Sequence, residues 1–66
     1  MIISFNKNLY PLKAIKSSIE AYDGLAKFKL SKQKGYYITE VSDIDKDVKN
    51  VLKDEFCNYI ISEIKQ

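Results

Sequence analysis

Residues 27–41 read KFKLSKQKGYYITEV, and this stretch decides the fold because it predicts a β-hairpin. Phe28 and Leu30 alternate with lysines, which is typical of a strand that buries one face. A polar loop follows at 31–35, and it ends on Gly35, a residue that adopts positive φ without strain.

The return segment of the hairpin, 36–41, is rich in aromatic and β-branched residues, which favour strands. Its alternation leaves two choices of buried face. We expect Tyr37, Thr39 and Val41 to point into the core, because that choice leaves Glu40 in solvent.

A strand and a helix precede the hairpin. Residues 2–6 read as a short strand, and apolar residues then recur at helical spacing from Pro11 to Tyr22. Gly24 is expected to end this helix as a left-handed cap. One flank of the helix has small residues that allow close packing, namely Ala14, Ser18 and Ala21.

A second helix follows the hairpin. Ser42 and Asp45 resemble a capping box, with Asp45 itself as the rival N-cap. The helical pattern continues to about Lys65, which predicts a helix of about 20 residues and about 30 Å.

The order β-α-β-β-α predicts one small α+β domain over residues 1–66, with a three-stranded, mainly antiparallel sheet and two helices on one face. The strand order stays open. The order 1-3-2 would be a ferredoxin-like fold that lacks its last strand, and it would leave the first strand with a free edge.

The composition argues against an enzyme. The chain has no histidine, no arginine and one cysteine. It therefore offers no imidazole base or ligand, no guanidinium fork for phosphate, and no pair of thiols. We expect no catalytic residues, no metal site and no cofactor.

The charge and the start of the chain bear on its partners and its location. A net charge of +2, spread along the chain, is too small to indicate nucleic acid or a membrane surface. The first residues lack the pattern of a signal peptide, and no apolar run is long enough to span a bilayer. With a lone cysteine, these features predict a cytoplasmic protein.

The last helix is apolar on more sides than one sheet can cover. Val48, Val51, Leu52, Phe56 and Tyr59 form the stripe that we assign to the sheet. A second apolar face lies well round the helix from this stripe. Either the first helix covers it, or it is an interface with a second copy or another protein. This face holds Cys57, Ile61 and Ile64, and Ile60 lies between it and the stripe; the candidate interface residues are Cys57, Ile60, Ile61 and Ile64.

The first strand offers a second interaction surface. If its edge is free, a partner can add a strand there. The candidate residues at this edge are Ile2, Ser4 and Asn6.

Two other functions compete with protein binding. Basic residues on the hairpin lie near Tyr36 and Tyr37, a mixture that could bind single-stranded nucleic acid, although alternating lysines also protect a strand edge. Those lysines are Lys27, Lys29, Lys32 and Lys34. A small phage-type inhibitor protein is also compatible with so short and chemically inert a chain.

Two stretches carry a resemblance to a known family. Ile3–Ile15 reads ISFNKNLYPLKAI, a strand ending in Phe and then a Tyr-Pro-Leu start of a helix. Glu55–Ile61 reads EFCNYII, a Phe-x-Asn group followed by paired aliphatic residues. In both stretches the chain resembles the HxsD-like family of His-Xaa-Ser systems, whose gene clusters modify a peptide with radical S-adenosylmethionine (SAM) enzymes. The resemblance implies an accessory protein whose partner is a radical SAM maturase or its substrate peptide.

From the residues alone, we expect a non-catalytic accessory or adaptor protein that binds a partner protein or peptide. A homodimer is the other way to cover the same surfaces.

Overall fold

The computed structural model describes all of residues 1–66. Five elements follow one another in the predicted order β-α-β-β-α. Their bounds are β1 Ile2–Asn6, α1 Leu12–Ala21, β2 Lys27–Gln33, β3 Tyr36–Ser42 and α2 Leu52–Ile64.

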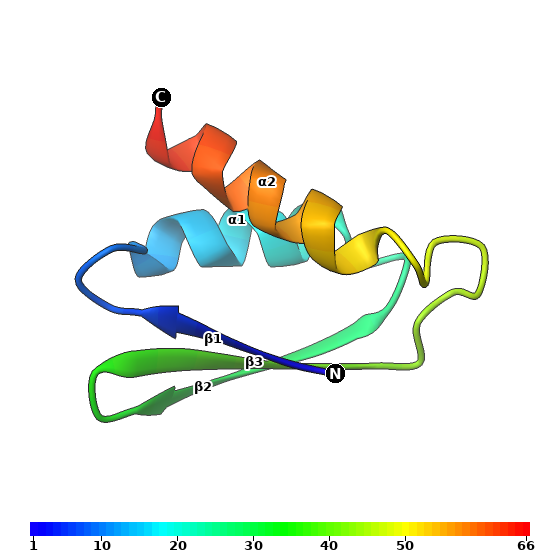
Figure 1. Cartoon of the computed structure of the whole chain (residues 1–66), viewed down its shortest axis with the longest axis horizontal. Helices are drawn as coiled ribbons and strands as arrows, with labels where there is room; N and C mark the ends of the chain where they lie inside the picture. The colour runs from blue at the N-terminus through cyan, green and yellow to red at the C-terminus, as the bar shows by residue number, and fades with distance from the viewer.

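The sheet has the strand order β1-β3-β2, and both of its pairings are antiparallel. Both helices lie on the same side of the sheet, with α1 and α2 next to each other (Figure 1). The fold class is therefore α+β as predicted, and the order is that of a ferredoxin-like fold without its last strand. β3 is the central strand, so β1 and β2 are the two edges.

The core lies between the sheet and the helices, with Phe56 of α2 at its centre. The ring of Phe56 stacks on Phe28 of β2 at 5.1 Å between centroids, and it lies 6.3 Å from the ring of Phe5 of β1. The buried apolar residues are Ile3, Phe5, Ala14, Ile15, Ala26, Val41, Leu52, Phe56 and Ile60.

The predicted buried face of β3 is confirmed. Val41 and Thr39 are buried and Tyr37 packs against the core, whereas Glu40 is exposed. The hydroxyl of Thr39 has no hydrogen-bond partner although the residue is fully buried.

Replacing Thr39 by valine is expected to stabilise the domain. An unpaired buried hydroxyl costs about 1–3 kcal/mol, and valine has nearly the same shape without it. We expect a gain of about 1 kcal/mol, which for a domain of this size raises Tm by about 4–8 °C. Thermal melts followed by circular dichroism measure the change in Tm. An unchanged or lower Tm would show that the unpaired Thr39 hydroxyl does not destabilise the domain.

Two small residues allow α1 and α2 to cross closely, as predicted for this flank. Ala14 and Ser18 are both buried, and the Ser18 hydroxyl donates a hydrogen bond to the carbonyl oxygen of Phe56 at 3.0 Å. Ala21, the third small residue, is exposed.

The last helix is shorter than predicted, because it begins at Leu52 and not near Asp45. The carboxylate of Asp45 accepts a hydrogen bond from the N–H of Asp47, and Asp43 has a positive φ of 49°. Such side-chain bonds to nearby backbone compete with helix, so the chain passes through successive turns up to Val51. The predicted capping box at Ser42 is therefore wrong, and Ser42 ends β3 instead.

Two predicted turns also differ in detail. The hairpin loop is the two-residue turn Lys34–Gly35, with Gly35 at φ 80°, because β2 continues to Gln33. Gly24 does not have positive φ. The first helix ends instead at Ala21, with Tyr22 as its C-cap, and the N–H of Tyr22 donates a hydrogen bond to the carbonyl of Ser18.

Candidate functional site

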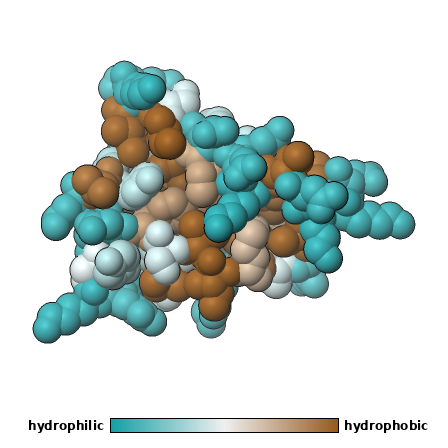
Figure 2. All heavy atoms as spheres, viewed as in Figure 1, coloured by the Kyte–Doolittle hydropathy of each residue, from teal (hydrophilic) through white to brown (hydrophobic).

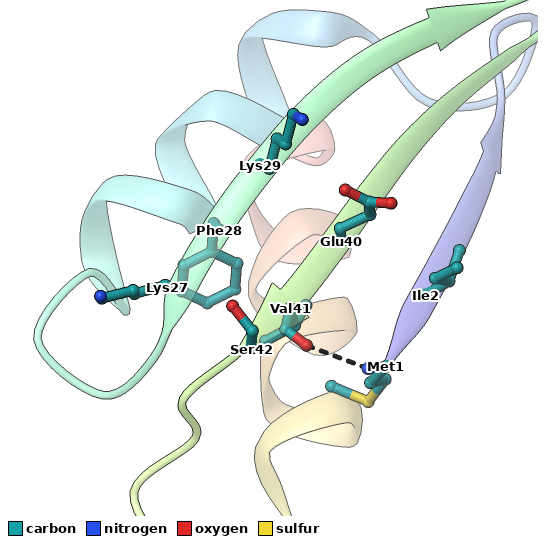
Figure 3. A pocket seen from close by; sticks show the side chains of 8 residues that line it. All are labelled: Met1, Ile2, Lys27, Phe28, Lys29, Glu40, Val41 and Ser42. Carbon is teal, nitrogen blue, oxygen red and sulfur yellow. Dashed lines mark hydrogen bonds between the residues drawn. The ribbon is translucent and has the colours of Figure 1, made fainter.

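The backbone hydrogen bonds of β1 show which of its groups are free. The amino group of Met1 donates to the carbonyl of Val41 at 2.9 Å (Figure 3). The N–H of Val41 donates in turn to the carbonyl of Met1 at 2.7 Å. In an antiparallel ladder, hydrogen-bonded and non-bonded pairs alternate. The register of β1 on β3 therefore turns the N–H and C=O of Ile3 and Phe5 toward β3.

The same alternation turns the backbone groups of Ile2, Ser4 and Asn6 toward the free edge. The carbonyl of Asn6 is already engaged, since it accepts hydrogen bonds from the N–H groups of Leu9 and Tyr10, both at 3.0 Å. The open edge of β1 thus offers both groups of Ile2, both groups of Ser4 and the N–H of Asn6. These are the three residues predicted for the strand edge.

The two edges of the sheet differ in charge. The residues of β2 that turn their backbone outward are Phe28, Leu30 and Lys32, because β3 binds the alternate positions. β2 also carries Lys27 and Lys29, and lysines on an edge strand discourage pairing with another chain. β1 reads IISFN and has no charged residue. Only the β1 edge is therefore unprotected.

The outer face of the sheet beside this edge is mixed and shallow. Figure 3 shows Ile2, Glu40 and Lys29 side by side on three strands, in the register that pairs Glu40 with both neighbours. The hollow there is open to solvent and carries one acid among lysines. It has no convergent set of polar groups that would hold a small molecule.

The structure divides the residues predicted for a partner face on α2. Ile60 is fully buried, so its assignment to an interface is wrong. Leu52, Phe56 and Ile60 form the stripe that faces the sheet, while Val51 and Tyr59, assigned to that stripe from sequence, are exposed. The cause is a rotation of the helix from the orientation that we assumed.

The other three residues predicted for that face lie in two different surroundings. Ile64 lines a shallow hollow with Ala14 and Ser17 of α1. Cys57 is half-buried and packs against the core, and Ile61 is 40% exposed. In Figure 2 the apolar atoms form separate patches with polar atoms between them, so the visible face has no single apolar surface.

Cys57 and Ile61 lie on the same side of the molecule as the β1 edge. Phe56 faces the sheet, and Tyr59 contacts Tyr22 of α1 at 5.8 Å between ring centroids. Since each helical residue turns about 100°, Cys57 and Ile61 lie on the flank of α2 away from α1. In Figure 3 α1 lies behind the β2 side and α2 behind β3 and β1, so this flank is toward β1.

Burial raises the pKa of the Cys57 thiol, with the Lys53 ammonium opposing the shift and the Asp54 carboxylate adding to it. A raised pKa means less thiolate near neutral pH, so Cys57 is not an activated nucleophile. Burial also raises the pKa of Tyr22, with smaller contributions from Glu55 and Tyr59.

Alkylation should therefore report the burial of Cys57. We expect iodoacetamide to react several-fold more slowly with the folded domain than with the urea-unfolded chain at the same pH.

The raised pKa of Cys57 also predicts that the stability of the domain falls as the pH rises above about 8.5, because the unfolded chain then releases the thiol proton first. Cys57→Ser should remove this part of the pH dependence. Equal alkylation rates in the folded and the unfolded chain would contradict the burial of Cys57, from which both expectations follow.

The hairpin lysines do not converge on one surface. Lys27 and Lys29 lie on the outer face, Lys32 lies on the opposite face of β2, and Lys34 is in the turn. Lys27 pairs with Asp43 at 3.2 Å, and Lys29 lies opposite Glu40. Tyr36 and Tyr37 also point to opposite faces. The geometry therefore gives little support to a nucleic-acid site.

Two features of the site were not visible in the sequence. The carbonyl of Asn6 shortens the free edge because the turn after β1 uses it, although the Asn6-Lys7-Asn8 turn itself is readable from composition. The alternation in β1 picked out Ile2, Ser4 and Asn6, but it did not show that their backbone groups turn away from the sheet, which depends on the pairing with β3. No local pattern in five residues encodes that pairing.

Comparison of the chain with protein-family models, with curated proteins and with solved structures gives no match. The resemblance to the HxsD-like family therefore stays a prediction. No group of three or more histidine, cysteine, aspartate or glutamate side chains is placed to share a metal ion. Neither helix has the length and apolar character needed to cross a membrane.

Proposed function

We propose that the chain is a non-catalytic accessory or adaptor protein that binds an extended segment of a partner protein or peptide along β1. The observation that carries this proposal is the set of outward N–H and C=O groups of Ile2 and Ser4 on an uncharged edge strand. A strand added to a sheet edge gains affinity from such main-chain bonds.

The position of the free edge supports the same function. It is the place that the last strand of a complete ferredoxin-like sheet would take. By helical geometry, the flank of α2 that carries Cys57 and the exposed Ile61 is turned away from α1, and the half-buried Cys57 is the residue of this flank that lies nearer the inward side of an added strand. In this proposal, one bound segment uses both of the surfaces that we predicted separately.

The resemblance to the HxsD-like family supports a partner from a peptide-modification system. Such a partner is a radical SAM maturase or its substrate peptide, and the chain would present one to the other. A cytoplasmic location fits this role.

The test compares two proline variants in a selection with a displayed library of random linear peptides. Ser4→Pro removes an outward donor from β1, and Lys32→Pro removes an outward donor from the opposite edge. Proline is tolerated at both because neither N–H bonds to β3. Circular dichroism of both variants is the check that each one folds.

We expect peptides selected on the wild-type domain to bind Lys32→Pro equally and Ser4→Pro at least about tenfold more weakly, since one main-chain bond and close approach are lost. Peptides that bind Ser4→Pro as well as wild type, or a selection that yields no binder, would overturn the proposal.

A further inference from the structure

We propose that, in the absence of a partner strand, β1 of a second copy of this chain fills the edge, as an antiparallel pair centred on Ile3. The inference rests on the proposed function in that it uses the same edge, but it names a different occupant. Partner binding would then compete with self-association.

The hydrogen-bonding pattern selects this register. A two-fold axis at Ile3 places Ile2 opposite Ser4 of the copy, and Ser4 opposite Ile2 of the copy. Both residues turn N–H and C=O outward, so the two symmetric pairs exchange four hydrogen bonds.

The neighbouring symmetric register is less favourable. An axis at Ser4 would pair Ile2 with Asn6 of the copy. It would then need the Asn6 carbonyl, which already accepts two hydrogen bonds from the turn. The register at Ser4 would therefore leave the Ile2 N–H of each copy without an acceptor, whereas the register at Ile3 satisfies every group that it pairs.

The side chains of β1 also fit a second copy. Ile2 is 64% exposed, and in this register the large side chain of Ile2 lies opposite the small side chain of Ser4. The two Ile2 side chains become diagonal neighbours on the outer face, at a separation of about 7–8 Å that such side chains can bridge. Each covers part of the other's apolar surface.

Charge separates this edge from the other one. Self-pairing of β1 brings no charged residues together, because β1 has none. Self-pairing of β2 would bring Lys27, Lys29 and Lys32 against the lysines of the copy. The interface is small beside a standard interface of about 1,600 Å², so the dimer should be weak and depend on concentration. A weak dimer is one that a partner strand can displace.

Sedimentation and amide hydrogen exchange test the proposal over a range from about 10 μM to about 1 mM. We expect the weight-average mass of the wild-type chain to rise toward that of a dimer. Exchange of the Ile2 and Ser4 amides should slow over the same range, while the Ile3 and Phe5 amides, already bonded to β3, stay unchanged.

A matched pair of lysine variants locates the interface. Ser4→Lys places two ammonium groups near each other across the axis, and we expect association at least about tenfold weaker than wild type. Ser31→Lys makes the same change on the same outer face but on β2, and it should associate like wild type.

A wild-type chain that stays monomeric at the highest concentration, or a Ser4→Lys variant that associates like wild type, would overturn the dimer. The dimer would also be overturned if Ile61→Glu lost association while exchange at Ser4 did not depend on concentration, because the interface would then be the helix flank.

If peptides bind the β1 edge but the chain is monomeric, only the proposed dimer fails. If the chain dimerises through β1 but no peptide binds, only the proposed function fails.

Discussion

Replacing Phe56 by alanine is expected to leave the domain largely unfolded. Phe56 is 1% exposed and joins the layers of the fold, with aromatic contacts to Phe5, Tyr22 and Phe28. Removing such a ring costs about 3–5 kcal/mol. A core in a domain of this size rarely supplies more than about 3–5 kcal/mol in all. The variant should therefore lose the cooperative transition in urea that circular dichroism detects in the wild-type chain.

Tyr59→Ala is the matched control, since Tyr59 is one turn further along the same helix but exposed. It makes one edge-to-face contact with Tyr22, at 5.8 Å between centroids. We expect it to cost about 1 kcal/mol and to keep a cooperative transition. If the free energy of unfolding of Phe56→Ala lies within about 1 kcal/mol of the wild-type value, then Phe56 does not hold the core together.

Replacing Ser18 by leucine is expected to have the second-largest effect, because it forces α1 and α2 apart. The fully buried Ser18 lies at the crossing, where its hydroxyl bonds to the Phe56 carbonyl. Overpacking at such a site costs about 1–3 kcal/mol, and loss of the hydrogen bond adds about 1 kcal/mol. Urea unfolding curves of the variant and the wild-type chain measure the sum.

Two further variants separate these causes. Ser18→Ala removes only the hydrogen bond and should cost about 1 kcal/mol. Lys16→Leu places the same leucine on the exposed side of α1 and should stay within about 0.5 kcal/mol of wild type. If Ser18→Leu is as stable as Ser18→Ala, the crossing has room that the structure does not show.

The arrangement of the sheet could be predicted from sequence where alternation and residue type agreed. Phe28 and Leu30 mark one strand, and the choice of Thr39 and Val41 as the buried face was correct because the alternative would bury Glu40. The class α+β followed from the order of these elements.

The bounds of the last helix could not be predicted, because two local preferences conflict between residues 43 and 51. The apolar residues Ile44 and Val48 continue the helical spacing, but both pack against the core from outside a helix, Ile44 from an irregular segment and Val48 from a turn. The Asp45 carboxylate bonds to nearby backbone, which breaks the helix. Spacing alone does not show which preference prevails.

The candidate site divides in the same way. The residues of the strand edge could be predicted only on the condition that β1 lies at an edge of the sheet, and the order β1-β3-β2 meets that condition. The buried face of the last helix could not be predicted. A rotation of the helix by less than the roughly 100° between successive residues decides whether Ile60 or Tyr59 is buried. The sequence is apolar at both positions, so only the packing of Phe56 between Phe28 and Tyr22 settles the rotation.

The most direct test of the central claim is amide hydrogen exchange at β1 with and without a peptide selected on the wild-type domain, at a concentration where the chain is monomeric. If a strand adds to this edge, exchange at the Ile2, Ser4 and Asn6 amides slows on binding, while exchange at Phe28 and Leu30 on the opposite edge is unchanged. A bound peptide that leaves exchange at Ser4 unaltered would contradict the account.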